Sequence, residues 1–513
     1  AKYYKEKFEK AKVVRQHFED VFDDCYEYTM PMRETFKSKT IGERRDEKIF
    51  DETAVVGVQE FASRLQQGLV PNFARWADFA AGSEIPLDER DEINNELDFI
   101  TEYVFEVLQN SNFAQEVHES FMDLAVGTGI LHVSEGDAIN PIKFNAIPLP
   151  HICLSNGPTN KIDAVYRKRK CKLNEIEIMY PKAKIPESVM STMNPEKKCT
   201  ILDAVYRVYD EPNVEKYKYC VVCMTDQELI LEKELEGSGS NPYIVFRWNK
   251  ASGEVYGRGP VFNAMAAIKT TNLVVELILQ NAQMNISGIY TFEDDGVINP
   301  DTITLTPGSL IPVAPNSRGL QALPAAGRFD VAQLVLGDMR QNIKKALYME
   351  TLGRPEGTPM SATEVSQRMA DLSTQIGSSF GRLQSELITP LLRRVIRILI
   401  KMGKIDIPKV NGREVKIVST SPLSQAQHEQ DVQDVLRFSS ILAQTFGPQM
   451  LNLVAKQDEM AKYLAEKMGL PEKLIRDAGE QQELLSQLQN QQQQANMVQN
   501  ELGIPQDQTG QES

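Results

Sequence analysis

Apolar residues recur every three or four positions over residues 1–30, 51–69 and 88–126, which places them on one face of an α-helix. Pro31 ends the first of these patterns, because proline lacks the amide hydrogen that a helix needs. The polar tripeptide Asn110-Ser111-Asn112 interrupts the third. We therefore expect four helices in the first 126 residues.

The pattern then changes to short runs that are rich in β-branched and aromatic residues. Such runs favour strands. They predict strands at residues 130–134, 164–168, 204–209, 217–224 and 243–248. A glycine- and serine-rich loop at 237–242 precedes the last strand. The fold class that these patterns indicate is α+β and predominantly helical.

Beyond Gly257 the helical pattern returns in two segments, residues 260–285 and 329–349. Between them lies a proline-rich stretch, 287–327, which we expect to be compact and non-helical. A Gly- and Pro-containing loop at 350–360 follows the second helix.

A long helix is predicted at residues 361–402. Ser361 and Glu364 form a capping box at its start, and Pro390 should kink it. Residues 428–468 are again helical in pattern. The glutamine-rich residues 480–502 have two interpretations, a helix that packs against its own copies or a disordered polar tail; we favour the packed helix.

Composition sets limits on these elements. The chain has 513 residues, 42% of them hydrophobic, and a formal net charge of −15. This length exceeds what one core usually holds, so we expect several packed regions. We find no uninterrupted apolar run of about 18 residues, so no membrane-spanning helix is expected. The charged N-terminal stretch is unlike a signal peptide and predicts assembly in a cytoplasm.

Six cysteines are scattered along the chain, which argues against a disulfide framework. Cys220 and Cys223 have the spacing of a zinc-binding pair, but no second pair completes four ligands. Residues three apart on a strand point to opposite faces. We therefore interpret both as core residues.

Motifs that carry chemistry are missing from the sequence. It has no phosphate-binding loop and no nucleophile elbow, and its five histidines are far apart. The acidic turn at 293–296 lacks the alternating ligands of a calcium loop. We therefore predict no catalytic residue, no metal and no cofactor. A soluble acidic enzyme of unknown reaction remains an alternative.

Four stretches resemble a known family. Residues 360–368, Met-Ser-Ala-Thr-Glu-Val-Ser-Gln-Arg, are similar to a motif of podovirus (short-tailed bacteriophage) head-to-tail connectors, also called portal proteins. Three other stretches agree in the expected order: Asp51-Glu52-Thr53-Ala54 with residues 61–65, 69–71 and Trp76; residues 246–248 with 256–260; and residues 421–427. The resemblance extends over about residues 1–450.

The resemblance implies a ring subunit, usually one of twelve, with wing, stem, clip and crown regions. The expected regions are an α+β wing at 1–255, a first stem helix at 256–286, the clip at 287–327, a second stem helix at 328–349, a channel loop at 350–360, a long kinked wing helix with a return strand at 361–424, crown helices at 425–480 and a glutamine-rich helix or tail at 481–513.

The family also implies a function. Double-stranded DNA would be packaged and ejected through the ring without sequence specificity and without a membrane. The partners would be the terminase motor, then the tail adaptor, with capsid and scaffold proteins around the ring. The location would be the virion portal vertex, reached from the host cytoplasm. A helical capsid-associated scaffold protein that does not surround DNA is the alternative.

Candidate residues follow from the same resemblance. The expected channel and gate residues are Leu352, Arg354, Glu356, Met360, Lys344 and Lys345. The expected partner-binding residues of the clip are Glu293, Asp294, Asp295 and Asp301. A wall of acidic subunits repels phosphate, so DNA would slide through it rather than bind.

Overall fold

The chain folds into two compact units that are each built from separated parts of the sequence. The computed structural model describes residues 1–37, 47–82, 87–180, 198–210, 214–224, 227–287, 290–291, 315, 321–322, 329–349, 376–406, 416–446 and 454–468. Unit 1 comprises Ala1–Gln67 and Ser111–Ile398, and unit 2 comprises Gly68–Asn110 and Leu399–Ser513.

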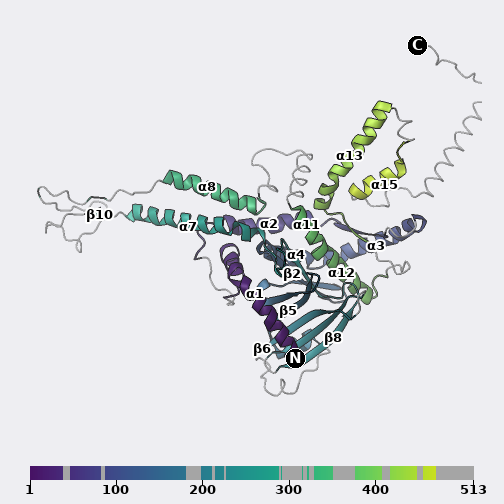
Figure 1. Ribbon diagram of the computed structural model, residues 1–513, viewed down its shortest axis with the longest axis horizontal. Coiled ribbons are helices and arrows are strands. Elements are labelled where there is room, and N and C mark those ends of the chain that lie inside the picture. The colour runs from purple at the N-terminus through teal and green to yellow at the C-terminus, as the bar shows by residue number, and fades with distance from the viewer. Residues whose placement is uncertain are drawn as a thin grey trace, which may run out of the picture. The chain divides into compact units, whose positions relative to one another are not determined.

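Unit 1 contains most of the helices and two sheets (Figure 1). Its helices are α1 Lys2–Thr29, α2 Thr53–Leu69, α4 Phe113–Val126, η1 Leu149–His151, α5 Leu173–Met179, α7 Pro260–Ser287, α8 Phe329–Ala346, α11 Gly377–Leu383, the π-helical turn η2 Gln384–Ile388 and α12 Thr389–Lys401, of which α2 and α12 end beyond the unit boundary. Its strands are β2 Thr128–Glu135, β3 Ile142–Ala146, β4 Ile152–Asn156, β5 Ile162–Lys172, β6 Lys198–Val208, β7 Lys216–Cys223, β8 Glu228–Glu236 and β9 Tyr243–Arg247, with a short pair β10 Tyr290–Thr291 and β11 Gln321–Ala322.

The larger sheet has five antiparallel strands in the order β4-β5-β6-β7-β8. Helix α1 packs on one face of it, where Phe8 and Ala11 join a buried apolar cluster with Tyr166 and Leu202. Ile176 of α5 packs on the opposite face, in a cluster with Cys171, Cys199 and other buried residues. Each face of the sheet therefore carries a buried apolar cluster.

The smaller sheet has the order β3-β2-β9 and packs against α4. Two aromatic pairs hold this layer, Phe121 against Phe246 at a centroid distance of 6.1 Å and Phe113 against Phe144 at 5.1 Å. Such edge-to-face pairs contribute about 0.5–1.5 kcal/mol each beyond their buried area.

Helices α7 and α8 lie side by side and extend away from the two sheets of unit 1 (Figure 1). The sequence predicted both helices, and their observed bounds differ from the predicted ones by no more than three residues.

The helix predicted from residue 361 is described from residue 376 onward. It runs through α11, the π-helical turn η2 and α12, and Gly403, with φ 67°, follows its end. Pro390 lies just after the π-helical turn. There the Thr389 N–H donates to the carbonyl of Gln384, five residues earlier, whereas in an α-helix it would donate to the carbonyl four residues earlier. Proline has no amide hydrogen, so a local change in the hydrogen-bond ladder is the expected consequence.

Unit 2 contains β1 Ala77–Ala80, α3 Leu87–Asn110, β12 Lys416–Ser419, α13 Pro422–Phe446 and α15 Gln457–Met468. Strands β1 and β12 are antiparallel, with Ala77 opposite Ser419. Trp76 packs against Phe105 of α3 at a centroid distance of 5.0 Å. Ser421, at the start of one of the four resembling stretches, accepts the Ser424 N–H and so caps α13.

The mixed α+β class and all the predicted strands from 130 to 248 are confirmed within the described residues. Strands β1, β3, β4, β8, β10 and β11 were not predicted individually, whereas β12 lies within 361–424, where a return strand was expected. The single helical pattern over 428–468 was wrong in detail, because α13 starts at Pro422 and ends at Phe446, before Gly447-Pro448 in the sequence.

The expectation that no helix could span a membrane was also wrong. Residues Pro260–Gln283 of α7 are long and apolar enough to do so by length and composition. The sequence argument counted uninterrupted apolar runs, whereas an averaged window tolerates polar residues such as Lys269 and Asn272. A single helix of this kind is weak evidence for a membrane, because core helices of soluble proteins pass the same test.

All six cysteines are buried and unpaired. Cys223 lies in the cluster under α5, while Val222, its neighbour, lies in the cluster under α1. Cys220 contacts Tyr4 of α1, so the two cysteines point to opposite faces, as the spacing predicted. Within the described residues no group of three His, Cys, Asp or Glu side chains is placed to hold a metal.

A joint at the base of the paired helices

Two of the four stretches that resemble the connectors, at 51–65 and 246–260, meet within unit 1 near the base of α7 and α8. Asp51 begins the first stretch. Its Oδ1 accepts the Thr53 N–H at 3.0 Å and so caps α2, while its Oδ2 lies 2.7 Å from Arg340 of α8. Burial acts to raise the pKa of Asp51, but the bonds from Thr53 and Arg340 outweigh it and the pKa is lowered. Asp51 is therefore a charged link between α2 and α8.

Asn272 completes this link from α7. Its Oδ1 accepts the backbone N–H groups of Phe50 and Asp51 at 2.7 and 3.0 Å, and its Nδ2 donates to Ile268 O at 2.9 Å. The side chain is 4% exposed, so all these bonds are protected from water. One amide thus fixes the segment before α2 onto α7.

An aromatic cluster fixes the end of α8. Phe61 of α2 packs against Trp248 at 5.1 Å, and Tyr348 lies 5.7 Å from Trp248 and 6.4 Å from Phe61. Tyr348 has φ 58°, a left-handed conformation that non-glycine residues adopt at a cost. Arg64 donates to the carbonyl of Met349, the last residue described before the 350–360 loop.

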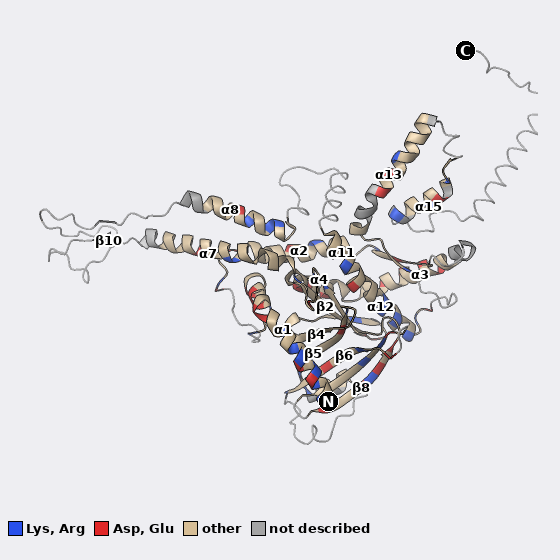
Figure 2. Cartoon of the chain, viewed as in Figure 1, with Lys and Arg blue, Asp and Glu red and all other residues tan. Residues whose placement is uncertain are grey.

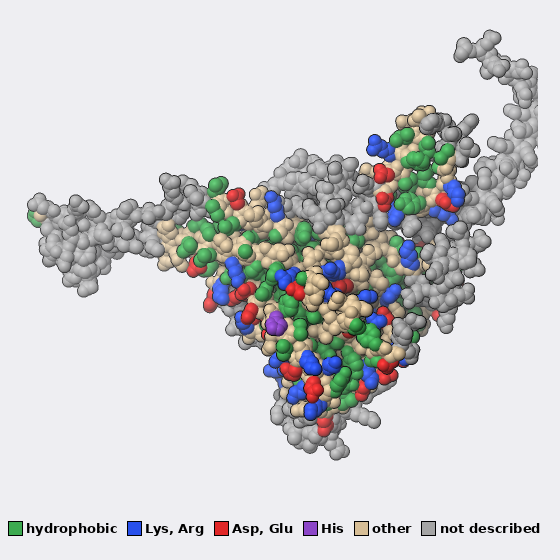
Figure 3. All heavy atoms as spheres, viewed as in Figure 1, with side chains coloured by type: hydrophobic (Ala, Val, Ile, Leu, Met, Phe, Trp, Pro, Cys, Tyr) green, Lys and Arg blue, Asp and Glu red, His purple; other side chains and the backbone are tan. Residues whose placement is uncertain are grey.

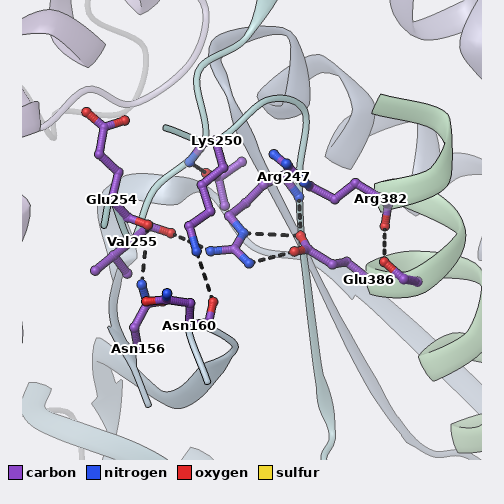
Figure 4. A network of polar contacts seen from close by, with 11 residues as sticks. Asn156, Asn160, Arg247, Lys250, Glu254, Val255, Arg382 and Glu386 are labelled. Atoms are coloured by element: carbon purple, nitrogen blue, oxygen red, sulfur yellow. Dashed lines mark hydrogen bonds and ion pairs between the residues drawn. The ribbon is translucent and has the colours of Figure 1, made fainter. Parts of the chain in front are cut away.

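Arg247 of the central stretch is bound by Glu386 (Figure 4). The Arg247 Nη2 donates to Oε1 at 2.5 Å, while its Nε and its backbone N–H donate to Oε2 at 3.1 and 3.0 Å. Nη1 donates to Val255 O at 3.1 Å. Glu386 lies in the π-helical turn, so the irregular helix is attached to the end of β9.

Lys250 lies beside this pair and donates to Asn160 O at 3.0 Å (Figure 4). Burial and the neighbouring charge of Arg247 lower the pKa of Lys250 from its usual value.

The two glycines of the central stretch are explained by close backbone approach. A Cβ at Gly259 would collide with Ala125 O, and one at Gly257 would collide with Gly127 O. Gly257 N–H donates to Thr128 Oγ1 at 2.9 Å, and Gly259 N–H donates to Val126 O at 2.8 Å. These glycines position the start of α7 against the turn between α4 and β2.

The predicted candidate residues fall in two groups. Lys344 and Lys345 are exposed on the last turn of α8. The other predicted gate residues, Leu352, Arg354, Glu356 and Met360, lie outside the described residues, as do the predicted clip residues Glu293, Asp294, Asp295 and Asp301 and the capping box at 361–364.

Sequence reasoning missed three residues of the joint: Asn272, Arg340 and Glu386. The signal for Asn272 was present, because an amide in the middle of an apolar helix is costly to bury without partners. Arg340 and Glu386 carried no comparable signal, since charged residues on a helix usually face solvent. The joint has no arrangement of nucleophile and base, and its polar groups bind one another.

The fold and the joint define a subunit in which the paired helices α7 and α8 are mounted on an α+β body. The chain belongs to the family described as bacteriophage head to tail connecting protein, whose family model matches residues 1–475.

Relatives support this assignment over most of the chain. It is 22% identical to the "Probable portal protein" of Bordetella phage BPP-1 over 496 residues, covering 90% of this chain and 85% of that protein. It is 21% identical to the portal protein of Enterobacteria phage T3, covering 84% and 80%, and 20% identical to that of Escherichia phage T7, with the same coverage.

Among solved structures, the neck of an empty gene transfer agent particle gives a TM-score of 0.34 at 12% identity, covering 84% of this chain and 95% of that chain. A native gene transfer agent virion gives 0.31 at 12%, covering 80% and 94%. Both scores are too low to carry an argument.

Proposed function

We propose that this chain is the portal subunit of a short-tailed phage, which assembles as a closed ring at the capsid vertex and lets double-stranded DNA pass. The carrying observation is the apolar surface of the α7–α8 pair (Figure 3). Leu273, Leu277 and Leu279 of α7 are 54%, 54% and 53% exposed, and Leu334 of α8 is 71% exposed. In a single chain these leucines remain in contact with water, so their apolar surface adds little to the stability of the fold.

A neighbouring copy of the same chain would cover these leucines. Fully burying a leucine stabilises by about 1.5–3 kcal/mol, so covering four half-exposed ones contributes on the order of 4 kcal/mol per interface. The contact would be heterologous, and heterologous contacts form rings when their rotation closes. A ring explains why α7 is apolar enough to resemble a membrane span.

The family plan assigns roles to the regions. Residues 256–286 and 328–349 would be the stem, 287–327 the clip and 350–360 a channel loop. The joint at Asp51 and Tyr348 would hold the stem on the wing and fix the point where the channel loop starts. Exposed Lys344 and Lys345, with Arg354, would contact passing phosphate, while the net charge of −15 per copy prevents tight binding.

Partners follow from the same plan. The terminase would dock on the clip first and the tail adaptor afterwards, and Glu293, Asp294, Asp295 and Asp301 would favour a basic partner surface. Leu352 and Met360 would close the channel when DNA is absent, and Glu356 would lie with them in the channel loop. Deleting residues 353–358 should then leave rings intact but let packaged DNA leak, which is measured as genome length retained per particle.

Ring assembly is tested by negative-stain imaging of the purified protein. The wild type should show closed rings down their axis, and the variant Leu273→Glu with Leu277→Glu should remain folded but monomeric. Ile139→Glu is the matched control, because Ile139 is 90% exposed on the β2–β3 turn and should not affect the ring. A wild-type protein that stays monomeric at micromolar concentration would favour the scaffold alternative.

A further inference from the structure

Four lysines form a row on one face of the five-stranded sheet. Lys168, Lys170 and Lys172 alternate along β5 and therefore share a face, the one that carries Tyr166 and α1. Lys198 of β6 lies directly opposite Lys172 in the pairing register. Lys168, Lys170 and Lys198 are exposed and Lys172 is half-buried.

This row is not neutralised by the described residues. Glu175, the described acidic residue nearest to Lys172 along the chain, accepts the backbone N–H of Lys172 at 2.9 Å, and no ion pair to the four lysine side chains is found among the described residues. Like charges directly opposite on two strands are destabilising, by a few tenths of a kcal/mol up to about 1 kcal/mol. Folding alone therefore does not favour this arrangement.

Strand β7 shows the opposite arrangement on the same face of the sheet, because its even-numbered residues pair with Leu202 and Ala204 of β6. Lys216 and Lys218 of β7 face glutamates of β8, with Lys216 3.4 Å from Glu236 and Lys218 3.4 Å from Glu232. Lys and Arg lie beside Asp and Glu along β8 (Figure 2). Unpaired lysines on β5 and β6 are thus a local feature and not the general pattern of the sheet.

We infer that this lysine row binds the phosphate backbone of duplex DNA at a surface separate from α8 and the channel. Lysine is a compact charge that binds phosphate without reading bases. Alternate residues on a strand are about 6.7 Å apart, close to the rise of two nucleotides of one DNA strand along the duplex axis. With a chain charge of −15, this row is a place where the protein attracts a polyanion.

The composition of the surface favours DNA over an acidic protein partner. Protein interfaces have an apolar core within a polar rim. Among the described residues, none of the large exposed hydrophobic side chains lies on β5 or β6. The row therefore offers charge but no apolar anchor.

The test uses covalently closed circular duplex DNA, which cannot be threaded through a closed ring. Binding to the full-length protein is measured at salt concentrations from 50 to 200 mM. Each phosphate contact contributes about 0.9 to the slope of log affinity against log salt. Lys168→Gln with Lys170→Gln removes two contacts and should therefore reduce the magnitude of this slope by about 1.8. The loss of affinity over this salt range should accordingly shrink about 12-fold.

The control is Lys216→Gln with Lys218→Gln, which removes the same charge from paired lysines of the same sheet. It should leave the slope unchanged. Equal slopes for the wild type and the Lys168/Lys170 variant, with both folded by circular dichroism, would overturn the inference, as would wild-type protein that binds polyglutamate but not DNA. Ring images taken in parallel report separately on the proposed function, because binding to circular DNA needs no channel.

Discussion

Removing the Glu386 carboxylate should destabilise unit 1 more than removing its partner Arg247. The Arg247 side chain is 4% exposed and that of Glu386 is 21% exposed. Glu386→Leu leaves a guanidinium and a backbone N–H without their acceptor in a buried site. Arg247→Met leaves a carboxylate that can turn toward water. The two single variants therefore differ in how much unpaired charge stays buried.

The magnitudes follow from this difference in exposure. Breaking a buried ion pair by removing one partner costs about 3–5 kcal/mol. Because water reaches Glu386, we expect about 3 kcal/mol for Glu386→Leu and about 1–2 kcal/mol for Arg247→Met. The double variant replaces the pair by apolar side chains and should cost about 1–2 kcal/mol. The coupling energy of the cycle is then about 3 kcal/mol in magnitude.

The assay is urea unfolding followed by tryptophan fluorescence. The chain has two tryptophans, Trp76 in unit 2 and Trp248 in unit 1, so a Trp76→Phe background isolates the signal next to Arg247. Single variants that both lie within about 0.5 kcal/mol of the background would refute the reasoning, since that is the value of a surface pair. An Arg247→Met variant less stable than Glu386→Leu would refute the exposure argument.

Two further predictions concern unit 1. Burial and the charges of Arg167 and Arg394 lower the pKa of His132 to about 3, so the folded state takes up this proton only at a lower pH than the unfolded state, whose pKa is near 6.5. The free energy of unfolding should therefore fall as the pH drops below about 6.5, by about 2 kcal/mol at pH 5. His132→Phe should remove that loss, as measured by urea midpoints at pH 7 and 5. Gly259→Ala should cost several kcal/mol in the same urea assay, because its Cβ would collide with Ala125 O. Gly337→Ala is the control: it lies in the middle of α8 with no atom near the added Cβ, and it should raise stability by about 1 kcal/mol. A Gly259→Ala variant of unchanged stability would contradict the close approach.

Several elements could be predicted because local chemistry specifies them. The apolar stripe of residues 51–69 and the stop at Pro31 gave α2 and the end of α1, because helical periodicity and proline act within a few residues. The same holds for α7 and α8 and for the five predicted strands. The alternation in β7 also placed Cys220 and Cys223 in the core. The four stretches that resemble head-to-tail connectors identified the family, and the family match over residues 1–475 confirms it.

Pairings between distant residues were decided by the tertiary structure. The sequence did not show that β12 pairs with β1, 336 positions apart from Ala80 to Lys416, because β1 has only four residues and is stabilised by hydrogen bonds to its distant partner. Asp51 is an ordinary helix cap in the sequence and becomes a link because Arg340 lies against it. Glu386 reads as a surface residue, yet β9 brings Arg247 to it. Each of these contacts depends on chain reversals whose geometry no local pattern encodes, so only the folded chain shows that the resembling stretches at 51–65 and 246–260 form one joint.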